Sequence, residues 1–173
     1  MQSPDEVFDV VDGHDEVVGQ ATRREVHARG LRHRAVHVLL FNLKAELFVQ
    51  KRAATKDTFP GRYDSSASGH LDSGETYDDG AVRELREELG VEVSVGELVK
   101  LFKIDACQET GWEFVWVYSL RGDYVPRIDP AEIEAGNFWD LDRVRATIGS
   151  HPEQCAPSFC RIIDEADRRG LLR

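Results

Sequence analysis

Three glutamates are spaced so that they could share one metal ion. Glu84, Glu87 and Glu88 stand at positions i, i+3 and i+4, which places three carboxylates on one face of a helix. Like charges gathered in this way repel one another unless something positive lies among them. Arg83 and Arg86 supply part of that charge, but a hard divalent cation satisfies several carboxylate oxygens from one rigid element far better. The spacing therefore indicates a site for such a cation.

The same run of charges would also suit a solvated surface helix held by salt bridges, and the residues upstream decide between the two interpretations. Gly69 lies six residues before Glu75, and Glu75 lies eight before Arg83. Residues 69–91 read GHLDSGETYDDGAVRELREELGV. This segment resembles the Nudix box, the signature of the Nudix hydrolase superfamily, at every specified position. The surface-helix interpretation is therefore set aside.

The resemblance implies a fold and a set of metal ligands. The fold is expected to be α/β, a Nudix α/β/α sandwich with a mixed β-sheet between helices and a loop–helix–loop catalytic segment. Glu87 and Glu88 would be the main ligands of Mg²⁺ or Mn²⁺. Glu84 would be a further ligand or the general base that deprotonates water, and the backbone carbonyl of Gly69 would complete the coordination.

Two more residues of the box receive roles from the same resemblance. Arg83 would pair with the carboxylates of the box as part of the catalytic machinery, and Glu75 would help to hold the geometry of loop and helix. The implied reaction is metal-dependent hydrolysis of a phosphoanhydride bond in a nucleoside diphosphate or a nucleoside diphosphate-linked compound. A bound metal would neutralise the substrate and lower the pKa of water. The box does not identify the substrate.

A wider segment, from about Phe8 to Leu120, resembles the isopentenyl-diphosphate isomerase-like branch of the superfamily. The residues that carry this likeness are KRAATKDTFPGRYDSSASGHLDSGE. The isomerase requires a cysteine in a Cys-Gly-His step, and here Ser68 takes that position, a far weaker acid–base group. Isomerase-like activity is therefore the alternative to hydrolysis. A non-catalytic nucleotide-binding module is a second alternative, but it normally goes with a damaged box.

Histidines outside the helix raise the hypothesis of a second metal. His33 and His70 stand at positions that match metal-binding histidines of the isomerases, and Glu113 is a plausible partner. His27 matches only with a gap of one residue. We expect that these side chains could bind a transition metal beside the main site, the alternative being that they are ordinary polar residues.

One further carboxylate from outside the box could also join the main site as a ligand or base. Four glutamates downstream are candidates: Glu109, Glu113, Glu132 and Glu134. Glu113 is preferred because it begins the strand-like run EFVWVY. Glu132 and Glu134 are expected to lie in a surface loop.

The elements that must position these residues follow from local patterns. Thr76 can cap the box helix and Gly90 can end it, with Val82, Leu85 and Leu89 facing a sheet. Strands are expected at Phe8–Asp12, Glu16–Thr22, Ala35–Asn42, Glu46–Arg52, Glu92–Val95, Val99–Ile104, Phe114–Leu120 and near Phe138. Helices are expected at Thr76–Leu89, Leu141–Ile148 and Ala156–Arg169, a short helix or irregular segment at Arg23–Arg34, and a loop at Thr55–Ser66.

Length and composition indicate the number of domains and the class of protein. The 173 residues, 41% hydrophobic and 31% charged, suit a single Nudix domain over residues 1–173. The start carries no secretory signal, and the longest apolar runs are too short to cross a bilayer, so a cytoplasmic protein is expected. Three cysteines without a CxxC pair disfavour a disulfide framework.

The net charge restricts the classes of binding partner. A formal net charge of −10 should repel nucleic acid duplexes. It would also repel a phosphorylated small molecule unless metal ions reverse the local field. The expected partner is therefore a small phosphoanhydride substrate, bound with metal, and the protein is expected to be a monomer or a homodimer.

Overall fold

The computed structural model describes residues 5–172, which form strands and helices in a mixed order. The strands are β1 (Val7–Val11), β2 (Val17–Thr22), β3 (His33–Phe41), β4 (Leu47–Arg52), β5 (Tyr63–Asp64), β6 (Ala67–His70), β7 (Val99–Ile104), β8 (Glu113–Arg121) and β9 (Ile133–Trp139). The helices are α1 (Arg23–Arg29), α2 (Tyr77–Leu89), α3 (Leu141–Ser150) and α4 (Pro157–Arg168).

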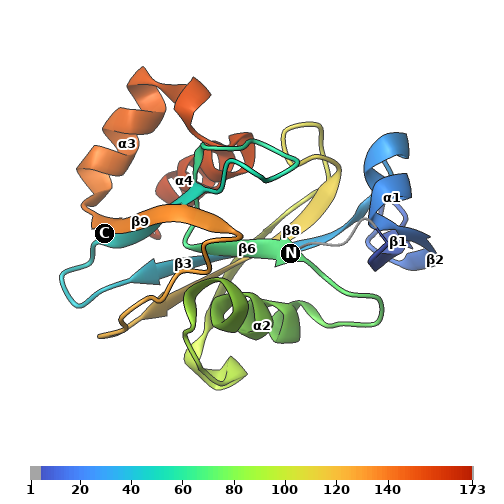
Figure 1. Cartoon of the computed structure of the whole chain (residues 1–173), viewed down its shortest axis with the longest axis horizontal. Coiled ribbons are helices and arrows are strands. Elements are labelled where there is room, and N and C mark those ends of the chain that lie inside the picture. Colours follow the sequence, from blue (N-terminus) through green and yellow to red (C-terminus); the bar gives the residue numbers. More distant parts are fainter. Residues whose placement is uncertain (1–4, 173) are drawn as a thin grey trace.

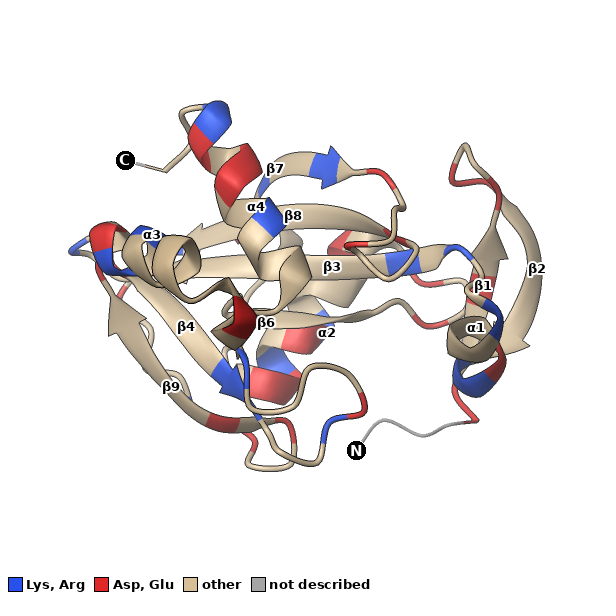
Figure 2. Cartoon of the chain, turned by 90° about the horizontal axis from the view of Figure 1, so that it is seen from above, with Lys and Arg blue, Asp and Glu red and all other residues tan. Residues whose placement is uncertain are grey.

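These elements form three layers around a seven-stranded mixed sheet. Helix α2 covers one face of the sheet, and α3 and α4 cover the other (Figure 1). The hairpin β1–β2 forms a separate two-stranded sheet and stands with α1 at one end of the molecule (Figure 2). The α/β/α sandwich expected from the sequence is confirmed. Among the helices in residues 5–172, none has both the length and the hydrophobicity needed to span a bilayer.

Strand β3 lies at the centre because both of its faces are apolar. Its sequence HRAVHVLLF is almost continuously buried, as is usual for a strand covered on both sides. Val36 and Val38 belong to the core under α2. Leu39 and Phe41 belong to the core under α3 and α4. Because side chains alternate along a strand, one segment thus serves both layers.

Strand register brings three polar residues to the same end of the sheet. Strand β3 runs parallel to β8, with His33 opposite Glu113. It runs antiparallel to β6, with Ala35 opposite His70. The start of β3, the start of β8 and the end of β6 therefore lie side by side.

Helix α2 is bounded by the residues expected from the sequence. The Thr76 hydroxyl accepts a hydrogen bond from the backbone N–H of Asp79 at 3.2 Å, which satisfies one donor of the first turn. Gly90 ends the helix in the left-handed conformation with φ 61°, where glycine pays no steric penalty. The caps thus fix the length of the helix that carries the box carboxylates.

The buried face of α2 differs by one residue from the expected one. Leu85 and Leu89 are fully buried against the sheet, as predicted. Ala81 joins them in the core, whereas Val82 is only partly buried. The prediction for Val82 was therefore wrong, because Ala81 and not Val82 lies on the face of α2 that packs against the sheet.

Two local expectations are corrected. Glu92–Val95 is not a strand, because Ser94 and Glu97 bond to one another (Ser94 N to Glu97 Oε2, 2.8 Å) and fold a 3₁₀ turn at Val95–Glu97. The expected loop Thr55–Ser66 contains the short strand β5, and the next residues form β6. The box therefore begins on a strand and reaches α2 through residues 71–76.

Candidate active site

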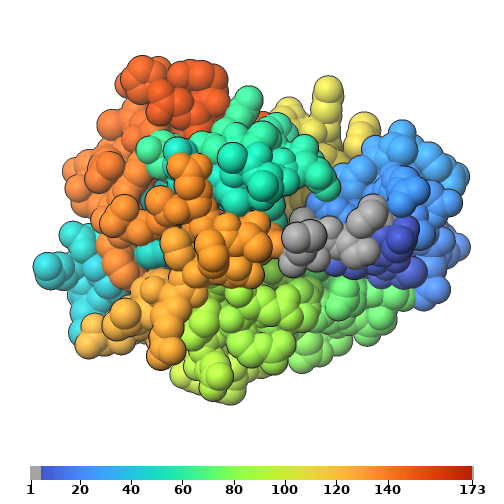
Figure 3. Space-filling model, in the orientation of Figure 1, coloured from blue at the N-terminus to red at the C-terminus, as the bar shows by residue number. Residues whose placement is uncertain are grey.

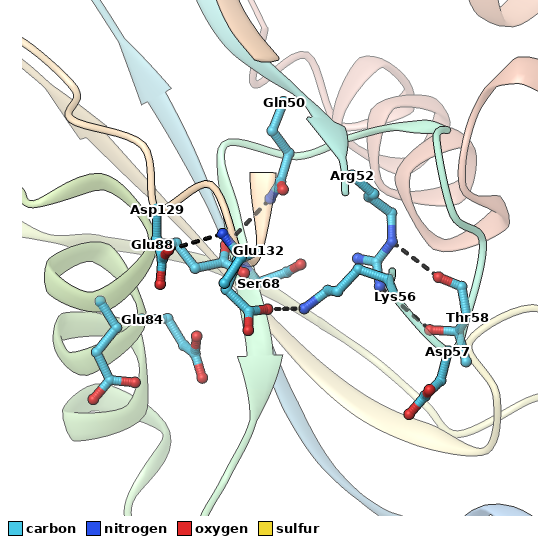
Figure 4. Close-up of polar contacts among 12 residues, drawn as sticks. Gln50, Arg52, Lys56, Asp57, Thr58, Ser68, Glu84, Glu88, Asp129 and Glu132 are labelled. Atoms are coloured by element: carbon cyan, nitrogen blue, oxygen red, sulfur yellow. Dashed lines mark hydrogen bonds and ion pairs between the residues drawn. The ribbon is translucent and has the colours of Figure 1, made fainter. Parts of the chain in front are cut away.

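A cavity of about 340 Å³ opens beside α2 and is lined mainly by carboxylates. Seven of its ten lining residues are acidic, and Arg83 is the one Lys or Arg among the ten. The lining residues are Glu6, Phe8, His70, Asp72, Arg83, Glu84, Glu87, Glu88, Asp129 and Glu132. All three glutamates predicted from the helical spacing thus face one space, and part of the group is drawn in Figure 4.

Two of the helix glutamates are buried. Glu84 is 6% exposed and Glu88 is 2% exposed, while the side chain of Glu87 is about half exposed. Burial raises the pKa of Glu84 to about 7 against the opposing effect of Arg83. Burial, together with the charge of Glu84, raises the pKa of Glu88 to about 8. Such shifts arise where like charges are held together away from water.

Arg83 links the helix to the loop before it, as the sequence predicted. Its guanidinium donates two hydrogen bonds to the Glu75 carboxylate, at 2.8 and 2.9 Å. It also donates to Glu84 at 2.6 Å, to Glu87 at 3.3 Å and to the backbone carbonyl of His70 at 2.8 Å. A planar fork of donors suits this several-fold pairing. Arg83 thereby ties the loop, the helix and the end of β6 together.

Gly69 allows the strand and the helix to touch. A Cβ atom at this position would overlap with the Glu84 carboxylate. Only glycine leaves room for that carboxylate against the backbone of β6. The spacing of the box therefore reflects a contact between its first residue and one of its glutamates.

Glu88 is oriented by two N–H donors. Its Oε2 atom accepts a hydrogen bond from the backbone N–H of Ser68 at 3.0 Å and from Nε2 of Gln50 at 3.2 Å. Gln50 was not singled out from the sequence. It lies on β4, 38 residues from Glu88 along the chain, and no local pattern marks it.

The position expected for Glu132 was wrong. Glu132 is 9% exposed, lines the carboxylate cavity and pairs with Lys56. Its carbonyl accepts from Ala53 at 3.0 Å, and Asp129 N donates to the carbonyl of Glu88 at 2.9 Å. These bonds draw the segment before β9 between α2 and the 53–62 loop, where Figure 3 shows it in orange. The pairing is long-range, so the local sequence carries no signal for it.

The other three downstream glutamates do not line the carboxylate cavity. Glu134 lies in β9, not in a loop, and pairs with Lys51 at 2.8 Å on the surface. Glu113, the preferred extra carboxylate, lines a neighbouring cavity of about 90 Å³, which Glu109 also lines. His70 borders both cavities.

The histidines of the second hypothesis do gather around Glu113. Nε2 of His70 lies 2.9 Å from Oε1 of Glu113, and Nε2 of His33 lies 3.6 Å from the same atom. One ligand atom from each of His27, His33 and His70 lies within 4.8 Å of the others. His27, which the sequence matched only with a gap, is therefore part of the cluster.

Comparison with known proteins agrees with this geometry. The family model described as the NUDIX domain matches residues 31–159. The chain belongs to the Nudix hydrolase family. It is 42% identical over 132 residues to an uncharacterised Nudix hydrolase of Streptomyces coelicolor, covering 75% of this chain and 72% of that protein.

Two further matches extend over most of this Nudix hydrolase. Isopentenyl-diphosphate Delta-isomerase 2 of Photorhabdus laumondii is 32% identical over 163 residues, 92% of each chain. The crystal structure of DR0079 from Deinococcus radiodurans superposes with a TM-score of 0.81 at 32% identity, covering 92% of this chain and 98% of that one. Proteins named as Nudix hydrolases and as isopentenyl-diphosphate isomerases are thus both found among its relatives.

Proposed function

We propose that this Nudix hydrolase uses Mg²⁺ or Mn²⁺ to hydrolyse a phosphoanhydride bond in a nucleoside diphosphate or a nucleoside diphosphate-linked compound. The observation that carries the proposal is the cavity in which seven of ten lining residues are acidic. An anionic phosphate cannot enter such a space unless cations reverse its field. The protein therefore needs metal to bind the class of substrate on which its family acts.

The donor set suits a hard divalent cation. Glu84, Glu87 and Glu88 supply carboxylate oxygens from one helix, and the backbone carbonyl of Gly69 is the fourth proposed ligand. Glu84 and Glu88 are buried without enough positive charge of their own, as their raised pKa values indicate. A cation bound there would neutralise phosphate charge and lower the pKa of water.

Side chains of the cavity supply the other roles in the proposed reaction. Glu84 is the proposed further ligand or general base, since its buried carboxylate lines the cavity beside Glu87 and Glu88, where it can bind the cation or accept a proton from water. Arg83 holds Glu84 and Glu87 in place through the contacts already described. Glu75 in turn fixes Arg83 through a two-point bond. Glu132, paired with Lys56, is a further candidate ligand on the opposite wall.

A substrate screen tests the reaction. The purified protein is incubated with nucleoside di- and triphosphates, dinucleotides, nucleotide sugars and short-chain diphosphates, with Mg²⁺, Mn²⁺ or EDTA, and released phosphate and nucleotide are measured. We expect metal-dependent release from at least one nucleotide class. Formation of an allylic diphosphate by isomerisation, without release of phosphate, would favour the isomerase alternative, which Ser68 disfavours.

Substitution of Glu87 tests the assignment of the site. Glu87→Gln removes one charge and keeps the shape, so we expect at least about 100-fold lower kcat with an unchanged circular dichroism spectrum, since one lost ligand disturbs the metal that makes the nucleophile. Glu92→Gln is the matched control, because Glu92 is exposed and lies outside the cavity. Equal rates for wild type and Glu87→Gln would show that the metal site is wrongly assigned.

The histidine cluster supports a second proposed metal, a transition metal beside the main site. Nδ1 of His33 lies 2.9 Å from the carbonyl of Leu31, which can only accept, so the ring proton is on Nδ1. Nε2 faces the Glu113 carboxylate at 3.6 Å and has no hydrogen-bond partner among the described residues. A buried ring nitrogen without a partner, beside a carboxylate, suits a cation between them.

The hydrogen bonds of His70 limit how its ring can take part in this cluster. Its Nδ1 lies 3.1 Å from the Arg23 guanidinium, which can only donate, so in the metal-free protein its proton is on Nε2 and is donated to Glu113 at 2.9 Å. Both ring nitrogens are then engaged, so His70 becomes a ligand only if the metal displaces Arg23 or the proton on Nε2. Burial lowers the pKa of His70 to about 4, which keeps the ring neutral. We expect retained zinc or manganese after exhaustive dialysis of wild type, and its loss in His33→Ala and His70→Ala. Metal-free wild type in elemental analysis would refute the second site.

A further inference from the structure

Gln50 places a neutral amide where the core pattern calls for an apolar side chain. It lies on β4 two residues after Phe48, so both side chains point to the α2 face, and Phe48 belongs to the core there. Gln50 is 0% exposed. Strand β4 is paired on both sides at this position, with Asp64 on β5 and Gly136 on β9, so the backbone of Gln50 is held firmly.

The amide is a poor choice for stability. Its Nε2 donates to Glu88 Oε2 at 3.2 Å and approaches the carbonyl of Ser66 at 3.4 Å. Its Oε1 is buried and has no hydrogen-bond partner in the described part of the chain. An unpaired buried acceptor costs free energy. An apolar residue of the same size would avoid that cost, which points to another reason for the amide.

The reason for an amide at position 50 is its hydrogen bond to Glu88. The bonds from Gln50 and from the backbone of Ser68 both fall on Oε2, as Figure 4 shows. Within residues 5–172 no Lys or Arg forms an ion pair with Glu88. Arg83 is engaged with other carboxylates, and Lys56 pairs with Glu132. Neutral donors alone therefore orient the most buried carboxylate of the cavity.

We propose that Gln50 is a positioning residue that aims the Glu88 carboxylate at the cation, an inference that rests on the proposed function. A Lys or Arg at this place would neutralise Glu88 permanently and compete with the metal. A neutral amide fixes one oxygen by a hydrogen bond and leaves the negative charge available. Partners of this kind behind a ligand govern metal affinity in many sites.

The test is Mn²⁺ binding to Gln50→Leu, which keeps the volume and removes the donor. Free Mn²⁺ is followed by electron paramagnetic resonance at a temperature well below unfolding, so the readout does not depend on turnover. We expect the dissociation constant to rise about tenfold, while the Tm of the metal-free protein stays equal or increases because a buried unpaired acceptor is gone. Gln50→Met provides the same test with a more adaptable side chain if the leucine variant fails to fold.

Gln154→Leu is the matched control, since Gln154 is exposed in the turn Pro152–Gln154 and remote from the cavity. It should bind Mn²⁺ as wild type does. Variants of Gln50 that fold and bind Mn²⁺ within twofold of wild type would overturn this inference alone. Wild type that binds no Mn²⁺ would overturn the proposed function instead, so the two failures are distinguishable.

Discussion

Glu84 and Glu88 combine two properties that oppose each other in the absence of metal. Both are buried, and both stand on one face of α2 beside other carboxylates. Burial disfavours the charged form, so both pKa values rise above the ordinary value for glutamate. The same burial makes them good ligands, because a cation meets little competition from water there. The proposed metal binding by these two residues is thus achieved at a cost to the stability of the metal-free protein.

This opposition predicts an unusual pH dependence of stability. The ordinary glutamate pKa of 4.5 rises to about 7 in Glu84 and about 8 in Glu88 on folding. Between pH 4.5 and 8 the folded protein therefore holds protons that the unfolded chain has released, so the free energy of unfolding falls as the pH rises. We expect a loss of at least about 2 kcal/mol, or roughly 4–8 °C in Tm, from pH 5 to pH 8 in EDTA.

Differential scanning calorimetry across this range is the measurement. The double variant Glu84→Gln/Glu88→Gln should give a flatter profile, because its amides do not titrate. Saturating Mn²⁺ should restore the stability of wild type at pH 8 by binding the folded state alone. A metal-free Tm that rises steadily from pH 5 to pH 8 would contradict the proposed origin of the shifts.

Among the elements, the hairpin β1–β2 has a role that its sequence did not reveal. Asp9 on β1 accepts hydrogen bonds from Ser73 Oγ at 2.7 Å and from the backbone N–H of Gly74 at 2.9 Å. These residues belong to the loop that joins β6 to α2. Their bonds outweigh burial and lower the pKa of Asp9. The hairpin therefore holds the loop between β6 and α2 from outside the box.

Replacing Asp9 tests this contact. Asp9→Ala removes both acceptors, so we expect amide hydrogen exchange at Gly74 to accelerate at least about tenfold, as local opening becomes easier. Metal affinity should fall by a smaller factor, because the proposed ligands on α2 are untouched. Asp123→Ala, in an exposed bend, serves as the control. Unchanged exchange at Gly74 in Asp9→Ala would mean that the loop is held by Arg83 and Glu75 alone.

At the scale of the whole molecule, sequence and structure agree best where the information is local. The caps of α2 and the shared face of three glutamates lie within 23 consecutive residues, so local spacing predicts them. The pairing of Arg83 with carboxylates of the box was implied by the family resemblance that the same residues carry. Glu132 and Gln50 reach the same cavity only through the pairing of distant strands. Register between such strands depends on the packing of the whole sheet, which a single sequence does not display.

The sequence predicted only in part the cluster that contains His33, His70 and Glu113. Their roles were suggested by resemblance, but their proximity depends on β3 pairing with β6 and β8 at once. The local sequence favours each strand without fixing how they align. The order of the strands, and with it the second cavity, therefore had to come from the structure.

The central place of β3 has a consequence for how the protein can be assayed. A slip of β3 by one residue would turn its side chains to the opposite faces. It would also shift β6, with Gly69 and His70, relative to α2. A misaligned chain could keep its helices and still lack a metal site. Stoichiometric Mn²⁺ uptake would then count correctly folded molecules in a preparation, which a helix signal in circular dichroism does not.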